Sequence, residues 1–219
     1  MVGRAESASF SAVWVFVEGG GSSRDEQAEI RKSFSRLFEK ALGRRSKPRV
    51  IACGGRNQAF KDWKIALKSE PRTCCLLLVD SEGPVSHGVG PWEHVRARKG
   101  DGWEKPDGAT DEQLHFMVQT MEAWLIADPE ALEAHYGRGF RKDALPARKD
   151  VEAIPKAQLC DALERATRDT KTKGRYDKSH GFTLIGLVDP ARLRAAAPHA
   201  VRFFDELLAA CTALPGGRR

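Results

Sequence analysis

Short apolar runs alternate with amphipathic stretches along the first 83 residues. Runs rich in Val, Leu, Ile and aromatic residues predict buried β-strands at 12–17, 49–53 and 73–79. Between them, apolar residues at helical spacing predict two helices. One opens with a capping-box pattern at Ser23 and Glu26 and ends near Leu42, and the other is marked by Phe60 and Trp63. The β-α-β-α-β order predicts an α/β fold with a parallel sheet flanked by helices.

The pattern changes after residue 83. Residues 84–110 are rich in Gly, Pro, Trp and charge without a clear period, which predicts an excursion or flexible loop. Residues 111–127 fit a helix, and a strand over 115–119 followed by a helix fits almost as well. Further helices are expected after an Asp128 cap, at 155–167 and at 198–211. We therefore expect one domain over 1–214, with a core at about 10–128, a helical C-terminal extension at about 129–214, and a tail at 215–219.

Composition narrows the class of protein. Of the 219 residues 41% are hydrophobic, which is too many for a disordered chain, and the longest apolar run, 74–79, is far shorter than the roughly 20 residues of a membrane helix. Residues 1–10 lack the basic start and apolar stretch of a signal peptide, so a cytoplasmic protein is expected. Five cysteines without a CxxC pair, and scattered histidines, predict neither a disulfide framework nor a zinc site.

The net charge of +6 is concentrated in one region. Between Arg138 and Lys178 there are twelve basic and seven acidic residues, a local surplus of +5. Such a surplus is compatible with a polyanionic partner such as nucleic acid, and a solvated basic surface explains the same composition.

Three acids follow two of the predicted strands directly. Glu18 comes after the first strand, and Asp80 and Glu82 come after the third, each group followed by glycine. The carboxyl ends of parallel strands lie at one edge of a sheet, so these acids converge if the two strands are neighbours. A single acid after a strand is also a common turn former, and only the combination of the three acids indicates a functional site. Converged carboxylates predict a hard divalent cation, Mg²⁺ or Mn²⁺.

This arrangement resembles the Toprim domain, which carries a glutamate after its first strand and Asp-x-Asp after a later one. Glu82 stands where aspartate is usual. Across nearly the whole chain the sequence is similar to a bacterial Toprim-like family, domain of unknown function 4276, in the segments 17–21, 77–82, 121–128 and 173–178. The resemblance implies a Toprim-like (Rossmann-like) fold. By analogy it implies metal-dependent nucleic-acid cleavage, often in phage defence beside an ATPase partner.

Two further side chains are candidates at the same edge. Glu122 shares a predicted apolar helix face, where a carboxylate needs a partner. That partner is either an arginine in a buried ion pair, or the metal site, to which Glu122 would add an accessory acid. Arg56 follows the second strand after two glycines, where it could bind a phosphate bidentately, and a simple turn explains it equally well.

The segment 171–178 combines four cations and a tyrosine without an apolar period. A solvated loop is one interpretation. The other is a nucleic-acid-binding segment in which Lys171, Lys173 and Arg175 contact the phosphate backbone and Tyr176 stacks on a base. Lys178 is then expected to act catalytically by stabilising the phosphate under attack.

Three functions follow from these features. The first is a metal-dependent phosphodiesterase on DNA or RNA, with Glu18, Asp80 and Glu82 as metal ligands and catalytic acids. The second is a Toprim-like subunit that binds nucleic acid or an ATPase without catalysis of its own. The third is a metal-dependent phosphotransferase on a small substrate. A basic region that extends beyond the site favours the first two.

Overall fold

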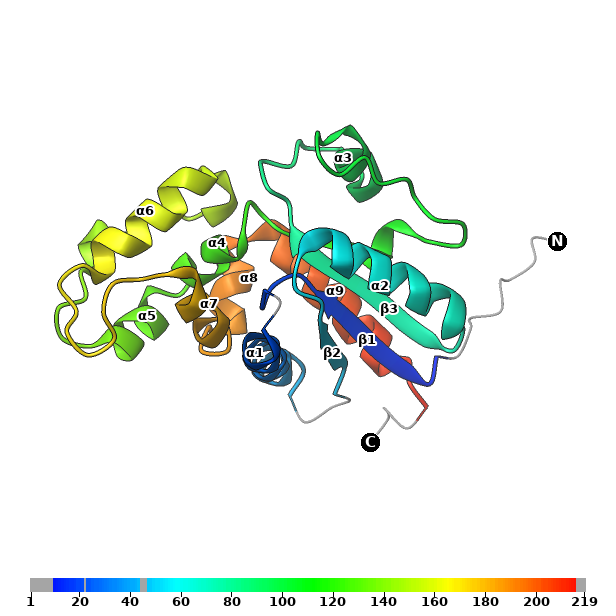
Figure 1. The fold of residues 1–219 in the computed structure, drawn as a ribbon, viewed down its shortest axis with the longest axis horizontal. Coiled ribbons are helices and arrows are strands. Elements are labelled where there is room, and N and C mark those ends of the chain that lie inside the picture. Colours follow the sequence, from blue (N-terminus) through cyan, green and yellow to red (C-terminus); the bar gives the residue numbers. More distant parts are fainter. Residues whose placement is uncertain (1–9, 22, 44–46, 216–219) are drawn as a thin grey trace.

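The computed structural model describes residues 10–21, 23–43 and 47–215 (Figure 1). Four parallel strands form one sheet in the order β2-β1-β3-β4. They are β1 (Ala12–Val17), β2 (Arg49–Ala52), β3 (Thr73–Asp80) and β4 (Leu114–Met117). The predicted α/β class and parallel sheet are confirmed, and β1 lies next to β3 as the convergence of the acids requires.

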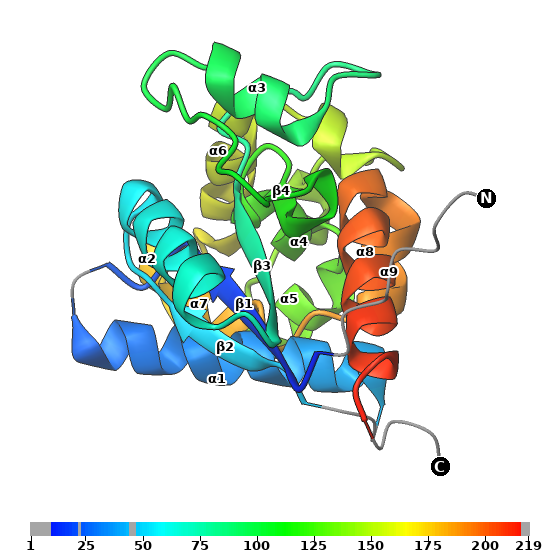
Figure 2. The same ribbon diagram turned by 90° about the vertical axis from the view of Figure 1, so that its right-hand side faces the viewer.

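Side chains that alternate along β1 face two different helical layers. Val13, Val15 and Val17 lie in the core shared with α1 (Arg24–Leu42) and α9 (Pro198–Thr212). Phe16 points to the opposite face, which α2 (Arg56–Ser69) covers. Figure 2 shows the strands between α2 on one side and α9 on the other. Both faces of the sheet are therefore buried, as continuous apolar strands require.

The start of α1 differs from the predicted capping box. The helix begins after Ser23, but the Ser23 side chain makes no capping hydrogen bond with the described residues. Acidic Asp25 and Glu26 in the first turn complement the helix dipole instead.

Of the two interpretations of residues 84–110, the excursion is the one that forms, and it packs on the face of the sheet that α2 covers. It contains α3 (Pro91–Ala97), and its Trp92 and Trp103 are buried. Their rings lie 6.2 and 4.2 Å from that of Phe60 on α2, measured between centroids. This aromatic packing holds the segment against α2. The sequence does not show it, because the two tryptophans have no regular spacing.

Of the two interpretations of residues 111–127, the strand followed by a helix is the one that forms. β4 is followed by α4 (Met121–Ile126), and every residue of both elements is buried. Asp128 then caps α5 (Pro129–Tyr136) as predicted, accepting a hydrogen bond from the Ala131 amide at 3.2 Å.

The C-terminal part is helical and shares the apolar core of α1 and α9. It comprises α6 (Lys156–Thr167), α7 (Lys178–Leu184), α8 (Pro190–Ala196) and α9, with short 3-10 turns at Lys142–Ala144 and Val151–Ala153. A third such turn, Asp111–Gln113, leads into β4. None of the helices in the described part of the chain is long and apolar enough to cross a membrane. The expectations for residues 1–9 and for the tail beyond Pro215 lie outside the described residues.

Candidate metal centre

Glu18, Asp80 and Glu82 meet at the carboxyl edge of the sheet. One carboxylate oxygen from each lies within 4.8 Å of the other two. The register explains the meeting, because Val17 at the end of β1 lies opposite Leu78 of β3. The predicted convergence of the three acids is therefore confirmed.

Two interlocked glycine loops hold Glu18 in place. The amide of Gly19 donates to the Gly54 carbonyl at 2.8 Å, and the Gly54 amide donates back to Gly19 at 3.0 Å. Gly54 has a φ of +73°, and a Cβ there would lie 2.4 Å from the Gly21 carbonyl oxygen. Only glycine fits so close an approach in the left-handed region. The loops after β1 and β2 can therefore pack together and fix the direction of Glu18.

Asp80 is the most deeply placed of the three acids. Its Oδ1 accepts the Met121 amide at the start of α4 at 2.9 Å, and its own amide donates to Glu18 Oε2 at 3.2 Å. Burial raises the pKa of Asp80 well above its usual value, and the charges of Glu18, Glu122 and Glu82 raise it further. Burial also raises the pKa of Glu18, although Arg56 opposes the shift. Added positive charge would therefore stabilise the ionised form of these acids.

Glu82 has an uncommon backbone conformation. Its φ is +63°, an uncommon value for a residue other than glycine, and one often found at functional sites. Its carboxylate pairs with Lys156 of α6 and lies 4.0 Å from the Arg98 guanidinium. Lys156 is a site residue that the sequence analysis missed. One signal was present, since a cation at the first position of a helix opposes the helix dipole.

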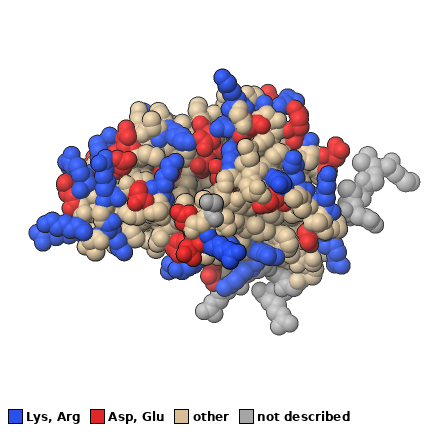
Figure 3. All heavy atoms as spheres, in the orientation of Figure 1, with Lys and Arg blue, Asp and Glu red and all other residues tan. Residues whose placement is uncertain are grey.

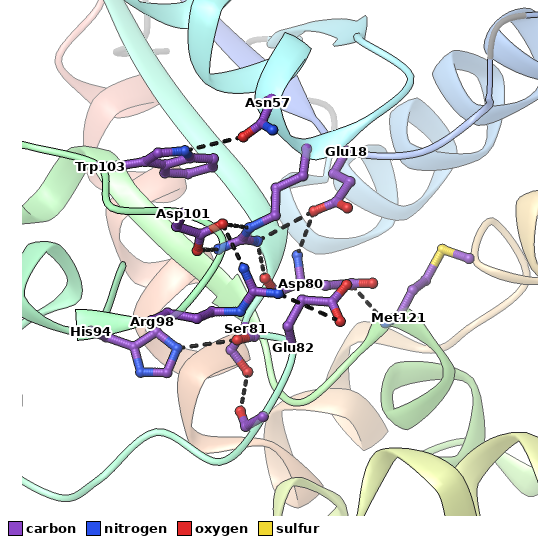
Figure 4. A network of polar contacts seen from close by, with 12 residues as sticks. Glu18, Asn57, Asp80, Ser81, Glu82, His94, Arg98, Asp101, Trp103 and Met121 are labelled. Carbon is purple, nitrogen blue, oxygen red and sulfur yellow. Dashed lines mark hydrogen bonds and ion pairs between the residues drawn. The ribbon is translucent and has the colours of Figure 1, made fainter. Parts of the chain in front are cut away.

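Arg56, the predicted phosphate-binding residue, makes its hydrogen bonds to acids and to a backbone carbonyl. The guanidinium donates to both oxygens of Asp101 at 2.8 and 2.7 Å, to the Asp80 carbonyl, and to Glu18 at 3.4 Å (Figure 4). It also lies over the Trp103 ring at 4.7 Å. These contacts use four of its five N–H donors, so Arg56 positions the acids and ties the segment 84–110 to them.

A cavity of about 270 Å³ opens over the acids. Lys156 and Lys178 line it together with Glu122, Cys160 and the glycine loops. Glu122 is buried and accepts a hydrogen bond from the Tyr176 hydroxyl at 3.1 Å, so tyrosine takes the place of the predicted arginine partner. Carboxylates and two lysines therefore line the same cavity, with the Lys156 ammonium paired to Glu82.

Tyr176 is 5% exposed, and its hydrogen bond to Glu122 turns it inward, so the expected base-stacking role does not fit this structure. The cations around it are at the surface, with Arg175 paired to Glu164. Lys and Arg gather at the end of the molecule formed by α5, α6 and the loop before α7, at the left of Figure 3. The exposed cations of this basic end are Arg138, Arg165, Arg168, Lys171, Lys173, Arg175 and Lys178.

Comparison with protein families gives one match. Residues 17–208 match the family described as domain of unknown function (DUF4276). The chain belongs to this family. No curated protein and no solved structure matches it. The matched region of this DUF4276 chain includes all of the acids and lysines of the cavity.

The donor set of this DUF4276 centre suits a hard divalent cation. Carboxylate oxygens are the ligands that Mg²⁺ and Mn²⁺ prefer, and three of them lie close enough to share one ion. The raised pKa of Asp80 and of Glu18 has the same origin, namely negative charge brought together out of water. Glu18, Asp80 and Glu82 would hold the ion.

Proposed function

We propose that this protein is a metal-dependent phosphodiesterase that cleaves DNA or RNA. One observation carries the proposal: three carboxylates that could hold a cation lie within 4.8 Å of one another, in a cavity that also contains Lys156 and Lys178. A site with only the acids would suit a structural ion. Two lysines beside them suit a substrate that brings negative charge of its own, as a phosphodiester does.

Each group has a distinct part in this chemistry. Mg²⁺ or Mn²⁺ bound there would supply an activated water and neutralise charge on the phosphate. Lys178 donates hydrogen bonds to the phosphate oxygens from the cavity wall. Glu18, whose pKa is raised by burial, is suited to take up and release a proton. Glu122 and Tyr176 support the cavity floor through their hydrogen bond.

The similarity to Toprim nucleases is part of the proposal. An acid after the first strand and an acid-x-acid after the adjacent third strand agree with the Toprim pattern except at Glu82. Glutamate has a longer side chain than aspartate, and its backbone here has a φ of +63°. The analogy also suggests a role in phage defence with an ATPase partner.

Cleavage of labelled single- and double-stranded DNA and RNA tests the proposal directly. We expect cleavage in Mg²⁺ or Mn²⁺, none in chelator, and a loss of at least about 100-fold in Asp80→Asn. Glu133→Gln, which removes an exposed acid on α5, should cleave like the wild type. Binding without cleavage in the wild type would indicate a non-catalytic subunit. Metal-dependent turnover of small phosphate esters alone would indicate the phosphotransferase.

The contribution of the basic end is measured by salt dependence. Each phosphate contact adds roughly 0.7 to 0.9 to the log–log slope of affinity against salt. Removing three contacts should flatten the slope by about two to three, and removing three unrelated surface lysines on α2 should not. The test compares Lys173→Gln/Arg175→Gln/Lys178→Gln with Lys61→Gln/Lys64→Gln/Lys68→Gln. Equal slopes for the two triple variants would indicate that the basic end contributes only to solubility.

A further inference from the structure

A second cavity adjoins the metal centre. It has a volume of about 340 Å³ and is formed by residues 81–83 and by the segment that contains α3. Glu82 lines both this cavity and the one above the acids. A bound chain that passed over Glu82 would therefore occupy both, with the metal centre on one side of that residue and α3 on the other.

Arg98 is the cation that the second cavity presents to a ligand. Its Nη1 donates to Asp101 at 2.6 Å, and its Nη2 lies 4.0 Å from Glu82, which is too far for a hydrogen bond. Asp101 is only 1% exposed and is itself held by two hydrogen bonds from Arg56. A buried carboxylate thus fixes one edge of the Arg98 guanidinium, and the Arg98 side chain as a whole is 27% exposed and lines the cavity.

The charges around Glu82 leave Arg98 free to bind an anion. Lys156 from α6 pairs with Glu82, and Arg98 lies 4.0 Å from Glu82 while it pairs with Asp101. Asp101 is itself shared with Arg56, so Glu82 and Asp101 together serve three cations. A divalent ion on Glu82 would draw on part of this negative charge, so the cations would then be undercompensated. Lys156 faces the first cavity and Arg98 the second. Two anionic groups, one in each cavity, would restore the balance.

We propose that the second cavity binds the phosphodiester next to the one that is cleaved, with Arg98 as its phosphate-binding residue. Arginine suits this task because its planar guanidinium pairs with phosphate oxygens through two parallel donors. The inference rests on the proposed function and adds to it a substrate class. The preferred substrate is an oligonucleotide with at least one phosphate beside the scissile bond, not an isolated phosphodiester.

Kinetics on short substrates test this requirement. The dinucleotide d(TpT) has one phosphodiester, and d(TpT) with a 5′- or a 3′-terminal phosphate has a neighbouring anion on one side. In Mg²⁺ we expect the wild type to prefer one phosphorylated form over d(TpT) by about tenfold or more in kcat/KM. Arg98→Gln should abolish this preference, because its kcat/KM should fall more on the preferred phosphorylated form than on d(TpT), and Arg98→Lys should retain part of it. Lys99→Gln, which removes the adjacent exposed cation, is the matched control.

A binding measurement tests the subsite independently of catalysis. Anisotropy of a labelled thymidine tetranucleotide in Mg²⁺ should show about tenfold weaker binding to Arg98→Gln, with a salt slope lower by about one, while Lys99→Gln matches the wild type. Binding that depends on Arg98 without any cleavage by the wild type would refute the proposed activity and support the subsite. Unchanged affinity in a folded Arg98→Gln, or an equal loss of rate on all three dinucleotides, would overturn the subsite.

Discussion

Asp80→Asn should separate the metal response from the stability of the fold. The substitution keeps an oxygen for the Met121 amide but removes one negative charge from the centre. In chelator, the acids repel each other at separations of at most 4.8 Å. At an effective dielectric constant of about 20, such a pair of charges costs at least roughly 3.5 kcal/mol before neighbouring cations are counted. The nearby cations offset part of this, so we expect the variant to be more stable than wild type by about 1–3 kcal/mol.

The same substitution should remove the stabilisation by metal. At a Mg²⁺ concentration about 100 times the Kd, binding to the folded chain stabilises the wild type by about 2.7 kcal/mol. For a chain of this size, this corresponds to a rise in Tm of roughly 5–10 °C. Asp80→Asn should lose most of this rise because one of three ligands has lost its charge. Its advantage in stability over the wild type should therefore shrink by roughly 2–3 kcal/mol between chelator and Mg²⁺.

Thermal melts of wild type, Asp80→Asn and Glu133→Gln, each in chelator and in Mg²⁺, provide the assay. Glu133→Gln carries the same change in net charge at an exposed position on α5, so it controls for general electrostatic effects. An equal rise in Tm for wild type and Asp80→Asn would show that Asp80 does not bind the ion. The proposed phosphodiesterase would then lose its main support.

Three further predictions concern pH, the glycine loops and the C-terminal helices. In chelator the stability of the wild type should fall relative to Asp80→Asn as pH rises above about 4, by at most about 1.4 kcal/mol per pH unit, because the raised pKa of Asp80 makes the folded state bind more protons than the unfolded state. A constant difference in unfolding free energy would refute this. Gly54→Ala should destabilise the protein by roughly 1–3 kcal/mol in chemical denaturation and weaken the Mg²⁺ response, since its Cβ meets the neighbouring loop, while Gly55→Ala has open space and should be nearly neutral. Lys40→Met should cost about 2–3 kcal/mol in urea unfolding, because the ammonium donates to three consecutive carbonyls at residues 186–188, and a smaller loss than Lys32→Met would contradict that role.

Some parts of the site were predictable because their signals are local. A short apolar run indicates a buried strand, and the residue that follows it lies at the carboxyl edge of the sheet wherever the strand is placed. Glu18 and Asp80 were therefore identifiable from their positions alone. The Asp128 cap was predictable for the same reason, since the cap and Pro129 are adjacent in the chain. The residues 111–127 could not be assigned because four buried residues suit a strand and a helix equally.

Contacts between distant segments were decided only by the tertiary structure. Lys156 reaches Glu82 across 74 positions, and Arg56 binds Asp101 across 45, so no local pattern joins either pair. Arg56 and Tyr176 looked free to bind nucleic acid because a sequence does not show which partner satisfies a polar group.

The sequence by itself determined the first three strands, their parallel direction and the acids at the ends of the first and third. These features depend on the periodicity of apolar residues and on turn-forming glycines, both of which act over a few residues. The tertiary structure decided which cations face those acids, and it folded the segment 84–110 over α2 through Trp92 and Trp103. Ion pairs and aromatic packing depend on distances in space, and those are set only when the whole core of the domain has assembled.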